Sequence, residues 1–241
     1  MRSSITGPRP TGQENGLPAL DELPVKRLAR ALANALGFEV TRLAPEQKRL
    51  LAGDPALRYR HLVARDAIVG EGQITVAEGR FLVELVRGLA GPGPIVEIGT
   101  LFGWSTRVIV LAKEPGRELI TVDNYSWNPF GLPPALHEAT TRAALADAVA
   151  SERVRVLAMS AADFYAGYAG PPPALMFIDG DHSYEAVAAD IRGSRQIGAQ
   201  VICGHDYDPK LFPGIARAVD ENGGVARREG TLWVLAGGAA R

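Results

Sequence analysis

The segment "VEIGTLFGWST", residues 96–106, joins an apolar strand, a glycine turn and the start of a helix. Glu97 stands two positions before Gly99, and Gly103 follows four positions after it. A site for a dinucleotide pyrophosphate requires the spacing G-x-G-x-x-G, in which the second glycine lets the backbone approach the phosphates. Leu101 occupies that second position here. The segment therefore predicts a strand–turn–helix unit of an α/β fold and argues against a dinucleotide ligand.

Further short apolar segments rich in Val and Ile alternate with helical stretches from Thr75 onward. Together with the strand of the opening segment, these apolar segments span residues 94–99, 118–123, 153–159, 174–179 and 199–206. This alternation predicts a mostly parallel sheet with helices on both faces. Residues 223–238 contain two more strand-like segments around "REG" with no room for a helix between them. We expect a terminal hairpin there, which makes a seven-stranded sheet with an antiparallel last strand.

The size and composition of the chain are those of an ordinary globular protein. It has 241 residues, 46% of them hydrophobic, and a formal net charge of −1. This length accommodates one large α/β domain and an extension. Residues 1–18 lack apolar periodicity and predict a flexible tail. Residues 19–74 contain apolar positions at helical spacing and predict an N-terminal helical extension or cover, which leaves residues 75–241 for the α/β domain.

The composition also argues against several partners and locations. Lys and Arg are spread among Asp and Glu, without the basic face that a nucleic acid requires. No apolar stretch approaches the ~20 residues needed to span a bilayer, and the N-terminus has no hydrophobic core typical of a secretion signal. The single cysteine, Cys203, lies in an apolar segment and cannot form an internal disulfide. We therefore expect a cytoplasmic protein that binds neither nucleic acid nor membranes.

Polar side chains follow several of the predicted strands at the point where each strand ends. Asp123 ends the second strand, Asp179 the fourth, and His205 with Asp206 the fifth. In open α/β sheets a ligand binds outside the carboxyl ends of the strands, so we expect these groups to converge. Clustered carboxylates repel one another and are costly to bury. One alternative for "DGDHS", residues 179–183, is that its polar residues only cap the next helix.

The E-x-G-x-x-x-G spacing resembles the first motif of the class I S-adenosylmethionine (AdoMet) methyltransferases. The resemblance implies a Rossmann-like fold in which residues 75–241 form the AdoMet-binding catalytic domain. The acidic residue and the glycine turn then accommodate the methionine end, Asp123 accepts the ribose hydroxyls, and the segment after the third strand lines the adenine. The cofactor contacts so implied are Glu97, Gly99, Gly103, Ser105, Asp123, Ser160, Ala161 and Asp179.

Two later segments narrow the resemblance. "FIDGDHSYEAVAADI", followed after one strand by "GHDYDP", is similar to metal-dependent macrolide-sugar O-methyltransferases and, more distantly, to catechol-type enzymes. Carried over by position, the ligands of a divalent metal such as Mg²⁺ or Mn²⁺ are Asp179, His205 and Asp206. Relatives commonly have oxygen ligands at the fifth-strand pair, so an alternative set replaces His205 by Asp181.

The activity implied is methylation of a hydroxyl group on a small molecule, such as a natural product or a sugar. A divalent cation beside the cofactor offsets the clustered carboxylates and lowers the pKa of the acceptor hydroxyl. His182 follows Asp179 by three residues and is the predicted catalytic base. We expect Tyr184 and Tyr207 to line the site and residues 124–134 to form part of a lid over the acceptor.

The same motifs leave other functions open. A relative of the same fold could carry out different chemistry, as an N-methyltransferase or a cephalosporin-hydroxylase-like enzyme does. A non-catalytic AdoMet-binding module is a further alternative. The identity of the acceptor is not encoded in these motifs, and the apolar faces of the N-terminal helices favour a homodimer.

Overall fold

The computed structural model describes residues 74–237, and every structural statement below concerns that part of the chain. The tail predicted over residues 1–18 lies outside the described residues. So does the helical extension predicted over residues 19–74, apart from Ile74. The sheet and helices described next all belong to the predicted α/β domain.

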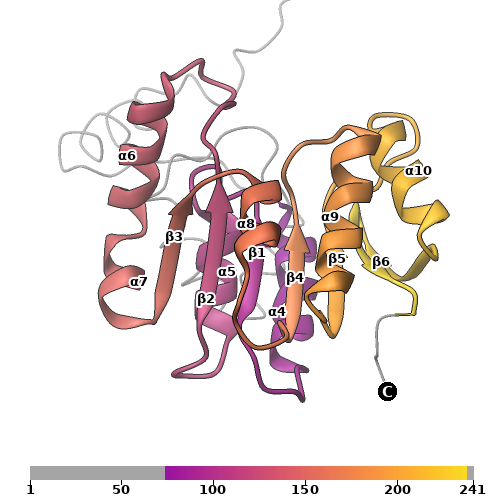
Figure 1. The fold of residues 1–241 in the computed structure, drawn as a ribbon, viewed down its shortest axis with the longest axis horizontal. Helices are drawn as coiled ribbons and strands as arrows, with labels where there is room; N and C mark the ends of the chain where they lie inside the picture. The colour runs from indigo at the N-terminus through magenta and orange to yellow at the C-terminus, as the bar shows by residue number, and fades with distance from the viewer. Residues whose placement is uncertain (1–73, 238–241) are drawn as a thin grey trace, which may run out of the picture. The chain divides into compact units, whose positions relative to one another are not determined.

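A seven-stranded sheet is the centre of the described residues (Figure 1). Its strands are β1 (Ile95–Ile98), β2 (Leu119–Asp123), β3 (Val154–Ala158), β4 (Leu175–Ile178), β5 (Val201–Gly204), β6 (Val225–Glu229) and β7 (Leu232–Leu235). The order is β3-β2-β1-β4-β5-β7-β6. Strands β1 to β5 are parallel, whereas β7 is antiparallel to both β5 and β6. The five predicted strands, the terminal hairpin and its antiparallel last strand are thus confirmed.

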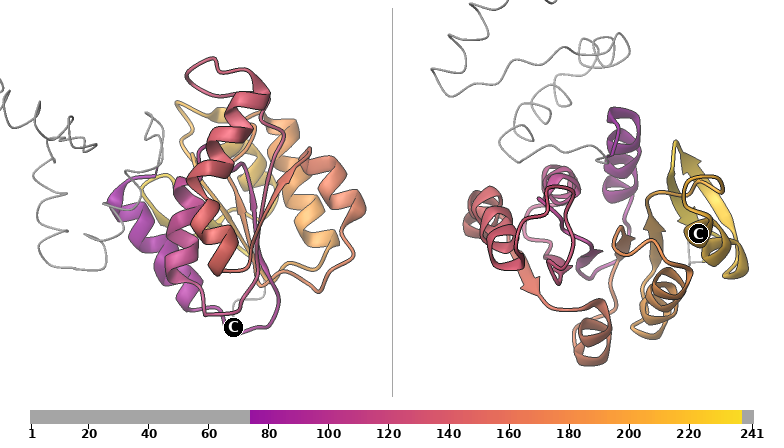
Figure 2. Two further views of the ribbon diagram at one scale, coloured as in Figure 1. Left: turned by 90° about the vertical axis from the view of Figure 1, so that its left-hand side faces the viewer. Right: turned by 90° about the horizontal axis from the view of Figure 1, so that it is seen from above.

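Helices cover both faces of this sheet, as Figure 2 shows from the side and from above. They are α4 (Val76–Arg87), α5 (Trp104–Ala112), α6 (Pro134–Ala144), α7 (Ala146–Ser151), α8 (Ala161–Gly167), α9 (Tyr184–Gln196) and α10 (Pro213–Glu221). Helices α4 and α5 pack on one face, and α8, α9 and α10 pack on the other. This is the mostly parallel sheet with helices on both faces that the strand–helix alternation predicted, and it has the Rossmann-like fold that the family resemblance implied.

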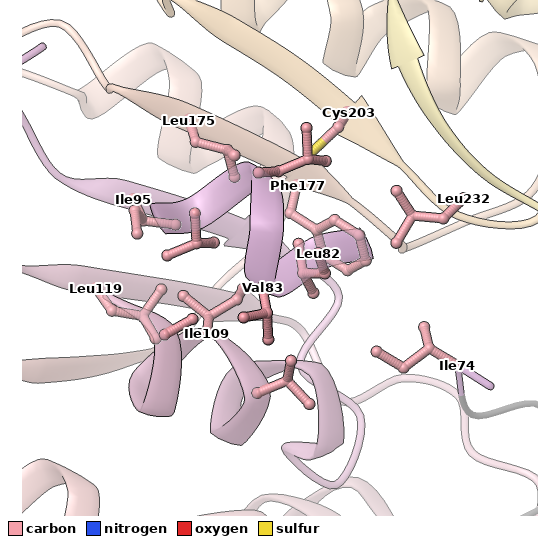
Figure 3. Packing of buried hydrophobic residues seen from close by; sticks show 14 of the residues in the cluster. Ile74, Leu82, Val83, Ile95, Ile109, Leu119, Leu175, Phe177, Cys203 and Leu232 are labelled. Carbon is pink, nitrogen blue, oxygen red and sulfur yellow. The ribbon is translucent and has the colours of Figure 1, made fainter. Parts of the chain in front are cut away.

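Two apolar clusters, one on each face, hold these layers together. Successive strand residues point to opposite faces, so Leu175 and Phe177 of β4 join the α4–α5 cluster while Met176 and Ile178 join the α8–α10 cluster. Figure 3 shows the first cluster, in which Leu82 of α4 lies among strand side chains. Cys203 is wholly buried there with a free thiol, as its apolar surroundings predicted.

Strand register brings the functional segments to one edge of the sheet. Ile98 at the end of β1 pairs with Val122 on one side and with Ile178 on the other, and Ile178 pairs with Gly204 of β5. The residues that follow these strand ends, from the glycine turn to His205, therefore emerge side by side. The predicted convergence of polar groups at the carboxyl edge is confirmed.

Candidate active site

The glycine turn after β1 is built around two glycines with left-handed backbone angles. Gly99 has φ +94°, and a Cβ placed on it would lie 2.0 Å from the carbonyl oxygen of Asp179. Gly103 has φ +83° and caps α5, where a Cβ would lie 2.8 Å from the side chain of Leu145. Only glycine fits at both positions. The first allows the ends of β1 and β4 to approach closely, while the second allows the turn to pack against the junction of α6 and α7.

Glu97 is wholly buried beneath this turn. Its carboxylate accepts hydrogen bonds from the hydroxyl groups of Ser105 and Thr121 at 2.6 Å and of Thr106 at 2.5 Å. Burial raises the pKa of Glu97 to about 7, and the charge of Asp179 adds to the increase, although the three hydroxyl groups oppose it. Glu97 and Ser105, both predicted cofactor contacts, therefore bond to each other and fix the shape of the turn from within.

Asp123, the predicted ribose acceptor, reaches back over the same turn. Its Oδ2 accepts the backbone N–H groups of Thr100 at 3.0 Å and Leu101 at 2.8 Å, and its Oδ1 accepts the N–H of Tyr125 at 2.7 Å. Leu101 and Tyr125 both have positive φ, at 49° and 56°. A left-handed conformation is uncommon and strained for such side chains, so the Asp123 carboxylate stabilises two costly turns.

The predicted adenine-side residues lie next to Asp123. The N–H of Met159 bonds to the carbonyl of Asp123 at 3.1 Å, and Ser160 and Ala161 follow at the start of α8. Ser160 is the N-cap of α8 and accepts the N–H of Asp163 at 3.1 Å, which is the usual role of serine at that position. Both residues thus lie at the carboxyl edge of the sheet.

Three side chains at the ends of β4 and β5 form a candidate metal centre. Each of Asp179, His205 and Asp206 offers one ligand atom, and these atoms lie within 4.8 Å of one another. The Nδ1 atom of His205 is 3.7 Å from Oδ1 of Asp179 and 3.4 Å from Oδ1 of Asp206. Asp206 has φ +61°, a conformation that costs energy in an ordinary residue and that is concentrated at functional sites.

The other side of His205 faces two residues that the sequence analysis did not consider. Its Nε2 lies 3.1 Å from the Thr231 hydroxyl and 3.5 Å from Oε2 of Glu78, which is itself almost wholly buried. Burial disfavours the charged imidazole, but the carboxylates of Asp179, Asp206 and Glu78 outweigh it and raise the pKa of His205 to about 12. Burial likewise opposes ionisation of Glu78, yet its hydrogen bonds hold the pKa of that carboxyl well below its usual range.

A local signal could have drawn attention to Glu78. The segment "TVAE", residues 75–78, matches a capping box, and the structure contains it: Glu78 accepts the N–H of Thr75 at 2.7 Å while the Thr75 hydroxyl accepts that of Glu78 at 3.2 Å. That signal predicts a helix start at residue 76. It does not reveal that the second carboxylate oxygen bonds to Thr231, 153 residues away.

His182 approaches the candidate metal centre from the start of α9. Its Nε2 lies 3.3 Å from Oδ2 of Asp206, its ring packs edge-on against Phe212, and 37% of its side chain is exposed. A small cavity of about 10 Å³ is lined by residues that include Asp179, His182 and His205. That volume is about what a single water needs. His182 is therefore partly exposed and lines a small cavity beside the candidate ligands.

Asp181 is outside this cluster. Its Oδ1 accepts the N–H of Ser183 at 2.7 Å, which lowers the pKa of Asp181, and the Ser183 hydroxyl in turn caps α9 through Ala186. The helix-capping role considered for "DGDHS" is real, and it falls to Asp181 and Ser183. Among residues 74–237 the ligand geometry favours the set with His205 over the alternative set with Asp181.

Two of the three aromatic residues in the segment after β2 are exposed, whereas Tyr125 is buried. Trp127 is 68% and Phe130 51% exposed, and the Phe130 ring lies 5.6 Å from that of Phe102 in the glycine turn. This contact places the predicted lid against the turn. Tyr184 and Tyr207 instead direct their hydroxyl groups to Glu221 and Asp220 of α10. They connect the start of α9 and the loop after β5 to that helix.

Comparison with known proteins identifies the domain that carries these features. A family model described as "Methyltransferase domain" matches residues 96–207, from β1 to the residue after Asp206. This segment is a methyltransferase domain. The glycine turn and the candidate metal centre both lie within it.

Solved structures agree with this result at the level of fold. The methyltransferase domain and its flanking elements are similar to Rv0187 from MTB, which was solved with its cofactor. The two chains share 23% identity with a TM-score of 0.54, and the match covers 76% of this chain and 86% of that one. An O-methyltransferase from Bacillus cereus in complex with SAH has 20% identity, a TM-score of 0.52, and coverage of 81% and 84%.

A third similar structure is TomG from Streptomyces achromogenes, an O-methyltransferase involved in tomaymycin synthesis and solved with SAM. It has 20% identity, a TM-score of 0.51, and coverage of 70% of this chain and 78% of that one. A search of curated proteins gave no match. The family model and the similar structures together confirm the predictions of a class I methyltransferase fold and of a methyltransferase as the enzyme class. Between residues 74 and 237, no helix is both long and apolar enough to cross a membrane.

Proposed function

We propose that this methyltransferase uses AdoMet to methylate a hydroxyl group of a small molecule, with the assistance of a divalent metal. One observation carries the proposal: the metal-ligand cluster directly adjoins the glycine turn. Asp179 supplies a candidate ligand oxygen from its side chain, while its backbone carbonyl is the group that a Cβ at Gly99 would strike. A cofactor at the turn and a metal at the cluster would therefore be neighbours, as methyl transfer to a coordinated oxygen requires.

The residues of the cluster fit a divalent cation. Nδ1 of His205 is buried and has no hydrogen-bond partner among the described residues, and it faces two carboxylates. An imidazole nitrogen with two carboxylate oxygens suits Mn²⁺, Fe²⁺, Co²⁺ or Zn²⁺, whereas Mg²⁺ prefers oxygen ligands. We propose Asp179, His205 and Asp206 as ligands. Mn²⁺ is the better fit of the two metals expected from the sequence.

The glycine turn and its surroundings support AdoMet as the cofactor. Glu97, Gly99 and Gly103 shape the turn, and Asp123 stands at the next strand end, where an acidic side chain can accept ribose hydroxyls. In this structure the Asp123 carboxylate accepts three backbone N–H groups. Each carboxylate oxygen has lone pairs left, so Asp123 can accept ribose hydroxyls while it keeps these bonds. The neighbours solved with SAM or SAH share this fold.

The chemistry divides among the residues as follows. When bound, AdoMet supplies an electrophilic methyl group on its sulfonium. When bound, the metal supplies a positive charge that lowers the pKa of an acceptor hydroxyl and fixes its direction. Asp179, His205 and Asp206 would hold that ion, and His182 would remove the proton of the acceptor hydroxyl with its neutral imidazole. Asp206 holds His182 through its second oxygen and so orients the base.

The acceptor class that we propose is a hydroxylated small molecule such as a natural product. The similarity to TomG supports this class, as does the exposed aromatic pair Trp127 and Phe130 beside the turn, which would form part of the lid. We also propose that the enzyme acts as a homodimer in the cytoplasm, as expected from the sequence.

The test is release of S-adenosylhomocysteine by the purified chain from AdoMet and a panel of phenolic, sugar and polyketide-like alcohols, with amines in parallel. We expect turnover with alcohols that is lost with EDTA and restored by Mn²⁺. Full turnover in EDTA would reject the role of the metal. Turnover with amines alone would instead favour the N-methylating alternative. Binding of AdoMet without any turnover across the panel would favour a non-catalytic module.

A further inference from the structure

We propose that Glu78, on α4, is a positioning residue for the metal centre. It acts through Thr231 to hold the Nε2–H of His205, so that Nδ1 is the atom presented to the metal. This inference rests on the metal site proposed above and adds a residue from outside the matched domain, which begins at Val96. The contact network around Glu78 carries the argument.

Counting protons fixes the orientation of His205. The Thr231 hydroxyl has one proton, and it donates that proton to Oε1 of Glu78 at 2.8 Å. Ionised Glu78 can only accept hydrogen bonds. At 3.1 Å from Nε2 of His205, the Thr231 oxygen must therefore act as the acceptor, and Nε2 must carry a hydrogen. Glu78, whose Oε2 also lies 3.5 Å from Nε2 of His205, thus fixes the hydrogen on that nitrogen both directly and through Thr231.

The opposite nitrogen, Nδ1, is then directed at the carboxylates of Asp179 and Asp206. It is buried and has no hydrogen-bond partner among the described residues. A lone pair that faces two carboxylates is unfavourable unless a positive charge lies between them. A divalent ion held by these three side chains would supply that charge, while Nε2 keeps its hydrogen.

The surrounding backbone is built to keep Glu78 in this place. Its Oε1 also accepts the N–H of Thr231 at 2.7 Å, and its Oε2 accepts the N–H of Thr75. Gly230, in the turn between β6 and β7, has φ +57°, and a Cβ there would lie 2.5 Å from Oε1 of Glu78. The turn can approach the carboxylate only because residue 230 is glycine. Helix α4, the β6–β7 turn and the end of β5 are therefore joined at one buried carboxylate.

Such an arrangement has a measurable consequence for the metal. Outer carboxylates that bond to a ligating histidine fix its tautomer and raise its basicity, and their loss typically lowers metal affinity about 10–100-fold. A histidine fixed in this way binds a metal ion more strongly through its free ring nitrogen. We therefore expect the site to favour Mn²⁺ and Co²⁺ over Mg²⁺ because of Glu78 as well as His205.

The test compares Glu78→Gln and Thr75→Ala with the wild-type chain. Glutamine at position 78 can still accept the Thr75 N–H with its amide oxygen and so keeps the capping box. Its NH2 group then faces Thr231 and cannot accept the Thr231 proton. Thr75→Ala removes the other half of the same cap and leaves the contacts of Glu78 with Thr231 and His205 intact. The dissociation constant for Mn²⁺ is measured by calorimetry, and the visible absorption of the Co²⁺-loaded protein reports the ligand set.

We expect Glu78→Gln to weaken Mn²⁺ binding about 10–100-fold and to shift the Co²⁺ absorption toward that of His205→Ala. Thr75→Ala should lower thermal stability and change neither metal measurement. Thr231→Val, which removes only the intervening hydroxyl, should resemble Glu78→Gln. Wild-type affinity and spectrum in Glu78→Gln would overturn the role of Glu78 and leave the metal site standing. If the wild-type chain binds neither ion, the metal site itself is rejected and Glu78 loses its role with it.

Discussion

The carboxylate of Asp206 lies between two histidines, with Oδ2 3.3 Å from Nε2 of His182 and Oδ1 3.4 Å from Nδ1 of His205. The two histidines differ in their surroundings. His205 is buried, whereas 37% of the His182 side chain is exposed. This difference suits a ligand held inside the protein and a base that exchanges protons with solvent. Asp206, whose φ is +61°, contacts both the proposed ligand and the proposed base.

His182→Ala should therefore reduce turnover while binding persists. A positioned acid–base group contributes about 10²–10⁴-fold to rate, so we expect a loss of that size in kcat, with near wild-type affinity for S-adenosylhomocysteine and Mn²⁺. Asp181→Asn is the matched control, because asparagine can accept the Ser183 N–H as Asp181 does. If His182→Ala keeps the wild-type kcat, His182 is not the catalytic base.

Asp179→Asn should remove metal binding and turnover together, because it takes a negative charge from the proposed ligand set. The change keeps the size of the side chain and leaves the backbone contact with Gly99 unchanged. Asp208→Asn serves as the control, since Asp208 uses its carboxylate to accept the N–H groups of Lys210 and Leu211. Calorimetry with Mn²⁺ is the measurement. Equal affinities for the two variants would argue against ligation by Asp179.

Glu97 should make the stability of the protein depend on pH. Burial raises the pKa of Glu97 from 4.5 to about 7 on folding, so between these values the folded chain binds more protons than the unfolded chain. The free energy of unfolding then falls as the pH rises from about 4.5 to 7, by about 3 kcal/mol from this group, and levels off above that range.

Glu97→Gln cannot ionise, so its unfolding free energy should fall less across the same pH range. Asp190 is buried too, and its pKa is also raised to about 7. The difference between the wild type and Glu97→Gln isolates the effect of Glu97 from this second group. Urea unfolding at pH 5, 6 and 8 measures it. Parallel pH profiles for the two proteins would show that Glu97 has an ordinary pKa.

Gly99→Ala should destabilise the fold far more than Gly131→Ala. Both glycines have positive φ, at 94° and 64°, and alanine in a left-handed conformation costs roughly 1–2 kcal/mol. At Gly131 nothing lies within 4 Å of the added Cβ, whereas at Gly99 it meets the Asp179 backbone. Overpacking adds typically 1–3 kcal/mol. Thermal unfolding measures the loss of stability in each variant. Equal losses in the two variants would mean that the turn relaxes freely around residue 99.

Much of the fold could be predicted from the sequence because its signals are local. Alternating apolar segments and glycines predicted the strands, and the strand ends predicted the edge at which Asp123, Asp179 and Asp206 gather. The family resemblance then supplied roles for these positions. The neighbours of each strand end, by contrast, depend on the order of strands in the sheet.

The parts that were missed are long-range. The partners of Glu78 are Thr75, three residues away, and Thr231, 153 residues away, and only the first leaves a pattern in the sequence. The same limit applies to Asp123: its place at a strand end predicted a ribose contact, but its hydrogen bonds to the turn after β1 leave no local pattern. Hydrogen bonds between distant segments follow from packing, and packing has no short motif.

The most direct test of the proposed function is a crystal structure of the full chain with S-adenosylhomocysteine and Mn²⁺, with the metal located by its anomalous scattering. We expect one manganese peak bound by Asp179, His205 Nδ1 and Asp206, and the ribose hydroxyls at Asp123 beside the Gly99 turn. A manganese peak away from these three side chains, or none at saturating Mn²⁺, would contradict the metal-assisted mechanism, and a nucleoside bound elsewhere would contradict the cofactor site.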